Sequence, residues 1–321
     1  MSSQLIFGLI GGFVLFNIGF YFLMVVVAAR TVYFNTFSRK KDAPRVRAVS
    51  CNTEEALAMD AIGMEWQRQH AAYKKDLHMV RDGLNFYGEY YDFGKDKAAI
   101  LLSGRTESLR YGYYFAKPYV DAGFNLLVID SRTHGLSDGT YITYGFEESK
   151  DALEWIRLLN RDFGMEYIVL HGICIGAASG MLAITDPSCP ACVKGIVTEG
   201  MFPNFAESMK NHLIERKRMW FPVMQCIDGY AKKCSGHSMK TGPIDAIPRL
   251  DKPILMLQSK EDPYSTAEYA QKMYDLCPAE EKKLVLFETG GHSLLRITHT
   301  ETYDSEITLF LNRLLSTGAT D

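Results

Sequence analysis

The strongest constraint on the fold is a glycine-flanked turn in the middle of the chain. Residues 167–170 are an apolar run typical of a buried strand, and residues 177–182 are small and apolar, as in a helix packed closely on a sheet. Between them, residues 172–176 read Gly-Ile-Cys-Ile-Gly. A glycine two positions on each side of Cys174 lets a strand and a helix pass close to each other. The sequence therefore predicts a strand, a tight turn with Cys174 at its tip, and a helix.

Cys174 is a candidate nucleophile because of where this turn would place it. A side chain at the N-terminus of a helix meets unpaired amide groups and the positive end of the helix dipole, which favour negative charge. The same strand–turn–helix context, usually with serine at its centre, forms a nucleophile elbow. A thiol in such a position, with an imidazole in reach, has a lowered pKa and reacts as the thiolate. The alternative is a buried structural cysteine on an inactive scaffold.

From residue 77 onward, the pattern alternates strands with helices. The expected strands are residues 84–91, 98–102, 124–129, 167–170, 193–197, 254–257 and 283–287. The expected helices, besides the one after Cys174, are residues 109–120, 146–159, 265–276 and 305–315. This alternation predicts an α/β fold with right-handed crossovers and a mostly parallel, doubly wound sheet. Residues 200–250 interrupt it, and we expect them to form a small helical cap with an apolar pocket, or an excursion that only covers the sheet.

The N-terminal residues 5–29 carry no charge and predict one transmembrane helix. At about 1.5 Å per residue, this run is long enough to cross a bilayer core of roughly 30 Å. A cleavable signal peptide would have a basic start and a shorter apolar core, and a buried core helix is rarely apolar on every face for so long. Basic residues follow the run: Arg30, Arg39, Lys40, Lys41, Arg45 and Arg47. Because positive charge flanks the cytoplasmic end of a span, we expect the rest of the chain in the cytoplasm.

These patterns divide the chain into three expected parts. Residues 1–30 form the anchor, residues 31–76 a basic linker with a helix, and residues 77–321 the α/β domain. Thr53 would cap a helix over residues 53–77, because threonine favours the N-cap position and two glutamates follow it.

Composition limits the partners and the compartment. The net charge of −3 gives no indication of nucleic-acid binding. Seven cysteines, an odd number without a regular framework, fit a reducing compartment. Cys189 and Cys192 have the spacing of a redox or metal site, but no second pair follows at the spacing of a zinc site. We therefore expect two structural thiols, and no metal.

Polar segments after two later strands supply partners for Cys174. In open α/β sheets, reactive groups gather at the carboxyl ends of the strands. Asp262 follows one expected strand, and His292 follows the last one after two glycines. The order nucleophile, acid, base predicts a triad in which His292 takes the thiol proton and Asp262 orients the imidazole. Glu261 is the alternative acid.

An oxyanion hole would complete this site. Its first donor would be the backbone N–H of Ile175, which follows the nucleophile, and its second the backbone N–H of Arg105, after the strand 98–102. The guanidinium of Arg105 would either meet an anionic group of the substrate or lie on the surface. His134 lies in a glycine-containing connector, where we expect it to tie the loop by hydrogen bonds rather than act as a base.

These motifs together resemble the α/β-hydrolase superfamily over residues 77–315. The resemblance rests on residues 130–139, 141–147, 171–178, 261–262 and 290–292. The chain looks most like the bacterial membrane-anchored branch, and its cysteine nucleophile is similar to that of dienelactone hydrolases. The resemblance implies the α/β-hydrolase fold and an esterase, thioesterase or peptidase-like hydrolase that needs no cofactor. The His-Gly that usually precedes the oxyanion loop is Ser103-Gly104 here.

Three functions stay open at this point. The first is a membrane-anchored acyl hydrolase of esterase or thioesterase type that cleaves a small-molecule substrate through an acyl-cysteine intermediate. The second is acyl transfer to an amine or thiol, because such acceptors attack a thioester readily. The third is a non-catalytic binding protein that kept the fold. The sequence names neither the acyl group nor the oligomeric state.

Overall fold

The centre of the molecule is a mostly parallel sheet. The computed structural model describes residues 3–39 and 53–317. Eight strands lie in the order β1-β2-β4-β3-β5-β6-β7-β8. Their bounds are β1 Lys74–Arg81, β2 Leu84–Tyr91, β3 Lys97–Leu102, β4 Asn125–Ile129, β5 Tyr167–Ile173, β6 Val193–Glu199, β7 Ile254–Ser259 and β8 Lys282–Phe287. Strands β3 to β8 run parallel, and β2 pairs antiparallel with β4 and β1, which confirms the predicted sheet.

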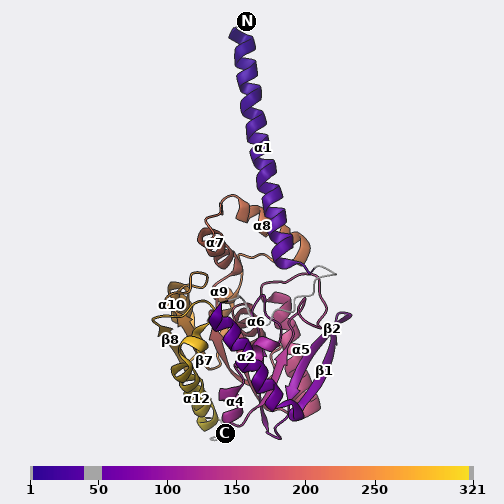
Figure 1. The fold of residues 1–321 in the computed structure, drawn as a ribbon, viewed down its shortest axis with the longest axis vertical. Coiled ribbons are helices and arrows are strands. Elements are labelled where there is room, and N and C mark those ends of the chain that lie inside the picture. The colour runs from indigo at the N-terminus through magenta and orange to yellow at the C-terminus, as the bar shows by residue number, and fades with distance from the viewer. Residues whose placement is uncertain (1–2, 40–52, 318–321) are drawn as a thin grey trace.

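Helices pack on both faces of this sheet (Figure 1). They are α1 Ser3–Phe37, α2 Glu54–Gln69, α3 Arg110–Tyr114, α4 Lys117–Asp121, α5 Phe146–Phe163, α6 Ile175–Ile184, α7 Phe205–Glu215, α8 Val223–Ser235, α9 Pro243–Ala246, α10 Ala267–Leu276, α11 Leu295–Thr298 and α12 Thr300–Thr317, with 3₁₀ turns η1 Ala71–Tyr73 and η2 Ile247–Arg249. Successive strand residues point to opposite faces, so the core forms two apolar clusters. Ile100 lies in the cluster with Trp155 of α5, whereas Leu101 lies in the cluster with Tyr303 of α12.

The helix α2 and the first hairpin correct one prediction. Thr53 caps α2 as expected, because its hydroxyl accepts a hydrogen bond from the Ala56 amide at 3.3 Å. The helix ends at Gln69 rather than at residue 77, however, because β1 begins at Lys74. This strand pairs with β2 across a turn whose two central residues both have positive φ. The pairing with β2 extends this segment as a strand instead of a helix, and it makes β1 the edge strand.

The predicted helix over residues 109–120 is split into α3 and α4. Pro118 stands at the start of α4. Proline has no amide hydrogen and its ring clashes with the preceding turn, so it fits the first turn of a helix but not the interior. A single continuous helix was therefore the wrong prediction for this segment.

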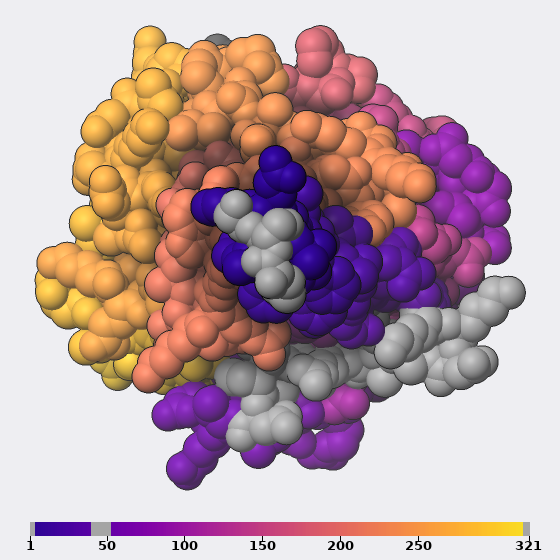
Figure 2. All heavy atoms as spheres, turned by 90° about the horizontal axis from the view of Figure 1, so that it is seen from above, coloured from indigo at the N-terminus to yellow at the C-terminus, as the bar shows by residue number. Residues whose placement is uncertain are grey.

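The N-terminal helix is longer than predicted and is joined directly to the rest of the molecule. It projects beyond the domain, with α7 and α8 beside its base (Figures 1 and 2). It is apolar and long enough to cross a membrane, and only 6% of its most apolar window is buried. Its last turns are different, because Val25, Ala29, Tyr33 and Phe37 are buried on one face, where α1 packs on α8.

The chain remains attached to the domain just after α1. Ser38 forms a β-bridge with Tyr141, and the amide of Arg39 donates a hydrogen bond to the Thr140 carbonyl at 2.8 Å. Part of the segment expected as a basic linker is therefore helix and docked backbone. The basic residues Lys40, Lys41, Arg45 and Arg47 lie outside the described residues.

Candidate active site

Cys174 lies on a sharp turn between β5 and α6, as the sequence predicts. Its backbone has φ 55° and ψ −114°, a region that costs a non-glycine residue about 1–3 kcal/mol. The flanking glycines leave no space for a side chain. A Cβ on Gly172 would lie 2.4 Å from the carbonyl carbon of Gly176, and one on Gly176 would lie 1.9 Å from the Leu102 oxygen. The strand, turn and helix predicted around Cys174 are therefore confirmed.

The structure brings Cys174, Asp262 and His292 together at the carboxyl edge of the sheet. Asp262 lies in the loop after β7, and His292 in the loop after β8. The Nδ1 atom of His292 is 2.6 Å from the Oδ2 atom of Asp262. The side chain of Cys174 also interacts with the imidazole, and this interaction raises the pKa of His292. Cys174, His292 and Asp262 thus form a continuous series of interacting side chains.

Charge pairing dominates the electrostatics of these three side chains. Burial by itself lowers the pKa of His292, but the negative charges of Asp262 and of the Cys174 thiolate outweigh it and raise that pKa well above its ordinary value. Burial by itself raises the pKa of Asp262, and the charge and hydrogen bond of His292 lower it overall. Pairing with the carboxylate of Asp262 therefore favours the protonated form of the imidazole.

Backbone amides also hold the carboxylate of Asp262. Its Oδ1 atom accepts hydrogen bonds from the amides of Tyr264 at 2.8 Å and Ser265 at 3.0 Å. Glu261, the alternative acid, is exposed and accepts instead from the Gly290 amide at 3.1 Å. Of the two acids, Asp262 is the one that contacts the imidazole.

Ile175 and Arg105, the residues expected to supply the two oxyanion donors, both lie close to Cys174. Ile175 is the first residue of α6, so its amide has no acceptor within the helix. Arg105, in the loop after β3, lines the same cavity as Cys174. His134 holds this loop as expected: its Nε2 atom lies 2.6 Å from the Arg105 carbonyl and its Nδ1 atom 2.9 Å from the Arg132 carbonyl.

Glu199, a buried carboxylic acid next to the triad, belongs to none of the motifs recognised in the sequence. It ends β6, and its carbonyl accepts a hydrogen bond from the Cys174 amide at 2.9 Å. Burial raises the pKa of its side chain to about 7, although hydrogen bonds from the Tyr303 hydroxyl at 2.7 Å and the Leu295 amide at 3.3 Å oppose this. The rule that polar residues at strand ends gather at one edge would have found it.

The sequence also gave no sign of an aromatic stack over the imidazole. His212 of α7 stacks on Tyr264 with ring centres 3.7 Å apart, and Tyr264 meets the ring of His292 edge-on at 5.5 Å. Burial, together with the charges of nearby cationic groups, lowers the pKa of His212 to about 3, so this ring is neutral at pH 7. Residues 200–250 carry no motif that could have indicated this contact.

A cavity of about 510 Å³ opens over the thiol. Its wall includes Arg105, Glu107, Cys174, Met209, His212, Arg216, Tyr264 and His292, together with Asn35 and Thr36 of α1. The last turns of the N-terminal helix therefore form part of the wall of the candidate site. No sequence pattern had indicated this.

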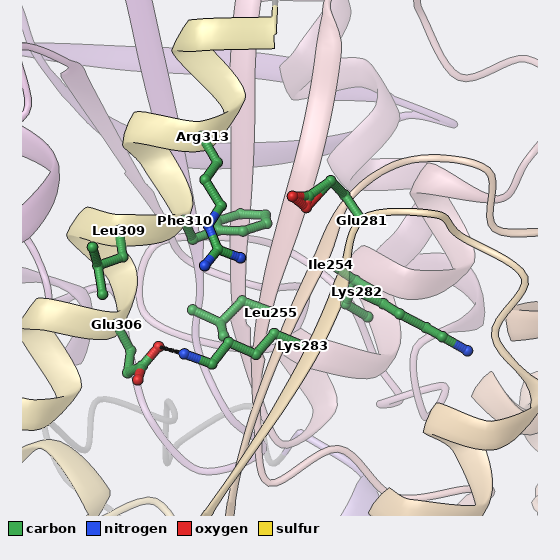
Figure 3. A pocket seen from close by; sticks show the side chains of 9 residues that line it. All are labelled: Ile254, Leu255, Glu281, Lys282, Lys283, Glu306, Leu309, Phe310 and Arg313. Atoms are coloured by element: carbon green, nitrogen blue, oxygen red, sulfur yellow. Dashed lines mark hydrogen bonds and ion pairs between the residues drawn. The ribbon is translucent and has the colours of Figure 1, made fainter.

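Two other features of the described residues are weaker candidates for a functional site than the cavity over Cys174. In the hollow of Figure 3, at the amino ends of β7 and β8, the free volume is about 10 Å³, room for about one water molecule. Lys283 and Glu306 form an ion pair there at 2.5 Å. Cys189 and Cys192 are free thiols, and no cluster of metal-binding side chains occurs within residues 3–39 and 53–317.

Comparison with known proteins identifies the fold. The esterase Pf2001 of Pyrococcus furiosus superposes with a TM-score of 0.66 at 19% identity, over 84% of this chain and 97% of that one. The chain has the α/β-hydrolase fold. The esterase EaEST of Exiguobacterium antarcticum superposes with a TM-score of 0.57 at 16% identity, over 73% and 98% of the two chains.

Comparison of sequences alone gives less information about the family than comparison of structures. No family model matches the chain. An uncharacterized protein of Bacillus subtilis (strain 168), YqkD, is 28% identical over 219 residues, which are 67% of this chain and 71% of that protein. These similarities establish the α/β-hydrolase fold, and any activity has to be argued from the site.

Proposed function

We propose that this protein is an acyl hydrolase of esterase or thioesterase type with Cys174 as nucleophile, His292 as base and Asp262 as the orienting acid. The observation that carries the proposal is the series of interacting side chains from Cys174, on its strained turn, through His292 to the buried Asp262, whose Oδ2 atom lies 2.6 Å from the Nδ1 atom of His292. Esterases among the proteins of similar fold support it. A small-molecule ester or thioester is the expected substrate.

The proposed reaction has two stages. The thiolate of Cys174 attacks the carbonyl carbon of the substrate, and the N–H groups of Ile175 and Arg105 stabilise the oxyanion. When the intermediate collapses, the leaving group takes the proton that His292 received from the thiol, and an acyl-cysteine thioester remains. Water then attacks this thioester while His292 accepts its proton. The acid leaves, and the proton returns to the sulfur of Cys174.

An activated ester tests the proposal. With p-nitrophenyl hexanoate in excess over the full-length protein, we expect a burst of nitrophenol release equal to the protein concentration, and a mass increase of one hexanoyl group on Cys174. The variant Cys174→Ala should lose both the burst and the adduct, whereas Cys189→Ala serves as a control that keeps them. Unchanged turnover in Cys174→Ala would disprove the assignment, and free acid at every concentration of an added amine or thiol would exclude acyl transfer.

We also propose that α1 anchors the protein in a membrane. Its apolar residues are almost all exposed, so α1 is not a core helix of the domain. A cleaved signal sequence is not favoured either, because Val25 and Ala29 belong both to the apolar run and to the face that packs on α8. Cleavage after the apolar run would remove Val25 and Ala29, and with them part of the helix face that packs on α8. The basic residues after it favour a cytoplasmic domain.

A further inference from the structure

The cavity over Cys174 lies at the base of the anchor. Asn35 and Thr36 line it, and both lie on the last turns of α1. The apolar run ends at Ala29, and Asn35 lies about 9 Å farther along the helix axis at 1.5 Å per residue. Because these turns are packed on α8, no flexible stalk separates the apolar run from the wall of the cavity.

The loop between α7 and α8 reaches back along the apolar part of α1. The hydroxyl of Tyr21 donates a hydrogen bond to the sulfur of Met219 at 3.7 Å. Tyr21 precedes Ala29 by eight residues, or about 12 Å along the axis. If the first 20 residues of α1, residues 3–22, cross the hydrocarbon, this contact lies at the boundary between the acyl chains and the headgroups.

The side chains of this loop suit such a boundary. Those exposed are Arg216, Lys217, Arg218, Met219, Trp220 and Phe221. Trp220 is 39% exposed and Phe221 is 59% exposed. Aromatic residues favour the membrane interface, and a cluster of basic residues is attracted to anionic headgroups. Arg216 thus belongs both to the wall of the cavity and to the start of a loop whose side chains suit contact with lipid.

Two guanidinium groups, those of Arg105 and Arg216, line the cavity, and the carboxylate of Glu107 attracts that of Arg105. Among the described residues, no hydrogen bond or ion pair reaches the guanidinium groups of Arg105 and Arg216. The nearby carboxylate of Glu107 accepts hydrogen bonds from the amide and hydroxyl of Thr106, at 3.2 and 2.8 Å. Burial also lowers the pKa of Arg105, as expected for a cation with few water contacts. Guanidinium groups whose N–H donors are not used by a protein acceptor are suited to bind a phosphate or carboxylate.

From these observations we infer that the substrate is an acylated amphiphile with an anionic group, taken from the membrane leaflet beside the domain, and that Arg105 and Arg216 bind the anionic group. The inference rests on the proposed acyl-hydrolase function. The anchor places the cavity next to the leaflet, and the α7–α8 loop contacts the headgroups. The two guanidinium groups hold the charged end of the molecule while its acyl carbonyl lies at the thiol.

A pair of soluble esters tests the charge preference. Full-length protein in a nonionic detergent would be assayed with 4-sulfophenyl hexanoate, which is anionic, and with 4-sulfamoylphenyl hexanoate, which is neutral. We expect kcat/KM to be about tenfold higher for the anionic ester, equivalent to about 1.4 kcal/mol. Arg216→Gln should remove this preference. Lys217→Gln, which alters a neighbouring residue outside the cavity wall, should keep it.

A measurement without turnover separates this inference from the proposed function. Hexyl phosphate should slow the alkylation of Cys174 by iodoacetamide, hexanol should not, and Arg216→Gln should abolish the protection. If esters are hydrolysed without charge preference and hexyl phosphate does not protect, the inference is wrong and the hydrolase proposal stands. If no ester is hydrolysed but protection depends on Arg216, the hydrolase proposal fails and the anion-binding site stands.

A third measurement tests whether lipid lies at the loop. Full-length protein in vesicles of brominated phosphatidylcholine should show quenched tryptophan fluorescence, and Trp220→Phe should lose most of the quenching. The other two tryptophans provide the internal control, since Trp155 is buried in the core and Trp66 is half-buried on α2. Equal quenching in both proteins would place the loop in water and exclude uptake of substrate from the leaflet.

Discussion

Glu199 shows how burial changes the pKa of a single carboxyl group. Its carboxyl group is fully buried at the end of β6, so ionisation leaves a charge in a site with only two hydrogen-bond donors. Burial therefore raises its pKa from the ordinary 4.5 to about 7. Because the native state holds this proton more tightly than the unfolded state, stability falls as the pH rises between these values.

The first prediction concerns this pH dependence. Between pH 4.5 and pH 8, we expect the wild-type protein to lose about 3 kcal/mol of unfolding free energy relative to Glu199→Gln, because the variant has no proton to lose. Urea unfolding at the two pH values would measure the difference. Glu280→Gln, at an exposed glutamate, should show no such difference. Parallel pH profiles for wild type and Glu199→Gln would contradict the raised pKa.

At the scale of elements, the close approach of β5 and α6 depends on glycine. A Cβ on Gly176 would lie 1.9 Å from the carbonyl oxygen of Leu102, and backbone cannot move aside as a side chain can. Gly229 in α8 is the opposite case, since it is exposed and nothing lies within 4 Å of the position of its missing Cβ.

The second prediction compares these two glycines. Gly176→Ala should destabilise the protein by about 3 kcal/mol or more, because either β3 or α6 has to shift. Gly229→Ala should stabilise it by about 0.5–1 kcal/mol, because alanine favours a helix interior. Urea unfolding measures both. A Gly176→Ala protein as stable as wild type would show that the turn is looser than described.

The docking of α1 on α8 is a second element-scale feature. Tyr33 is fully buried there and stacks with Tyr230 of α8, with ring centres 6.1 Å apart. Most of α1, by contrast, is exposed. The helix therefore contributes to the stability of the domain through its last turns only.

The third prediction separates these two parts of the helix. Tyr33→Ala should lower the melting temperature of the full-length protein in detergent by about 5–10 °C, because it leaves a cavity in the core. Phe16→Ala, at a side chain that is 70% exposed, should leave the melting temperature unchanged. Equal shifts for the two variants would mean that α1 does not dock on the domain.

At the scale of the whole molecule, the N-terminal helix α1, the α7–α8 loop and the cavity lie at one end of the domain. Arg30 and Arg39 are the described basic residues after the apolar run. If α1 spans a membrane as proposed, the positive-inside rule places this end in the cytoplasm.

The fourth prediction is the orientation of the domain. Green fluorescent protein fused to the C-terminus should fluoresce in a bacterial host, whereas alkaline phosphatase fused there should be inactive, because it needs the oxidising periplasm to form its disulfides. Substitution of Arg30 and Arg39 by glutamine should weaken this preference. An active phosphatase fusion on the wild-type chain would reverse the proposed orientation.

The sequence by itself determined the sheet and the order of the candidate triad. Apolar runs and glycines are local signals, and parallel strands bring residues that follow them to one edge, so Cys174, Asp262 and His292 could be found without coordinates. Local signals failed where tertiary contacts outweighed them, as when pairing with β2 turned residues 74–77 from predicted helix into β1.

Only the tertiary structure decided what surrounds the triad. The pKa of Glu199, the stack of His212 on Tyr264 and the contribution of Asn35 to the cavity wall all depend on segments far apart in the chain. Burial and packing between such segments are properties of the whole fold, and no short pattern records them. The sequence thus determined which groups could react, and the packing of α1 and α7 around them decided what those groups can reach.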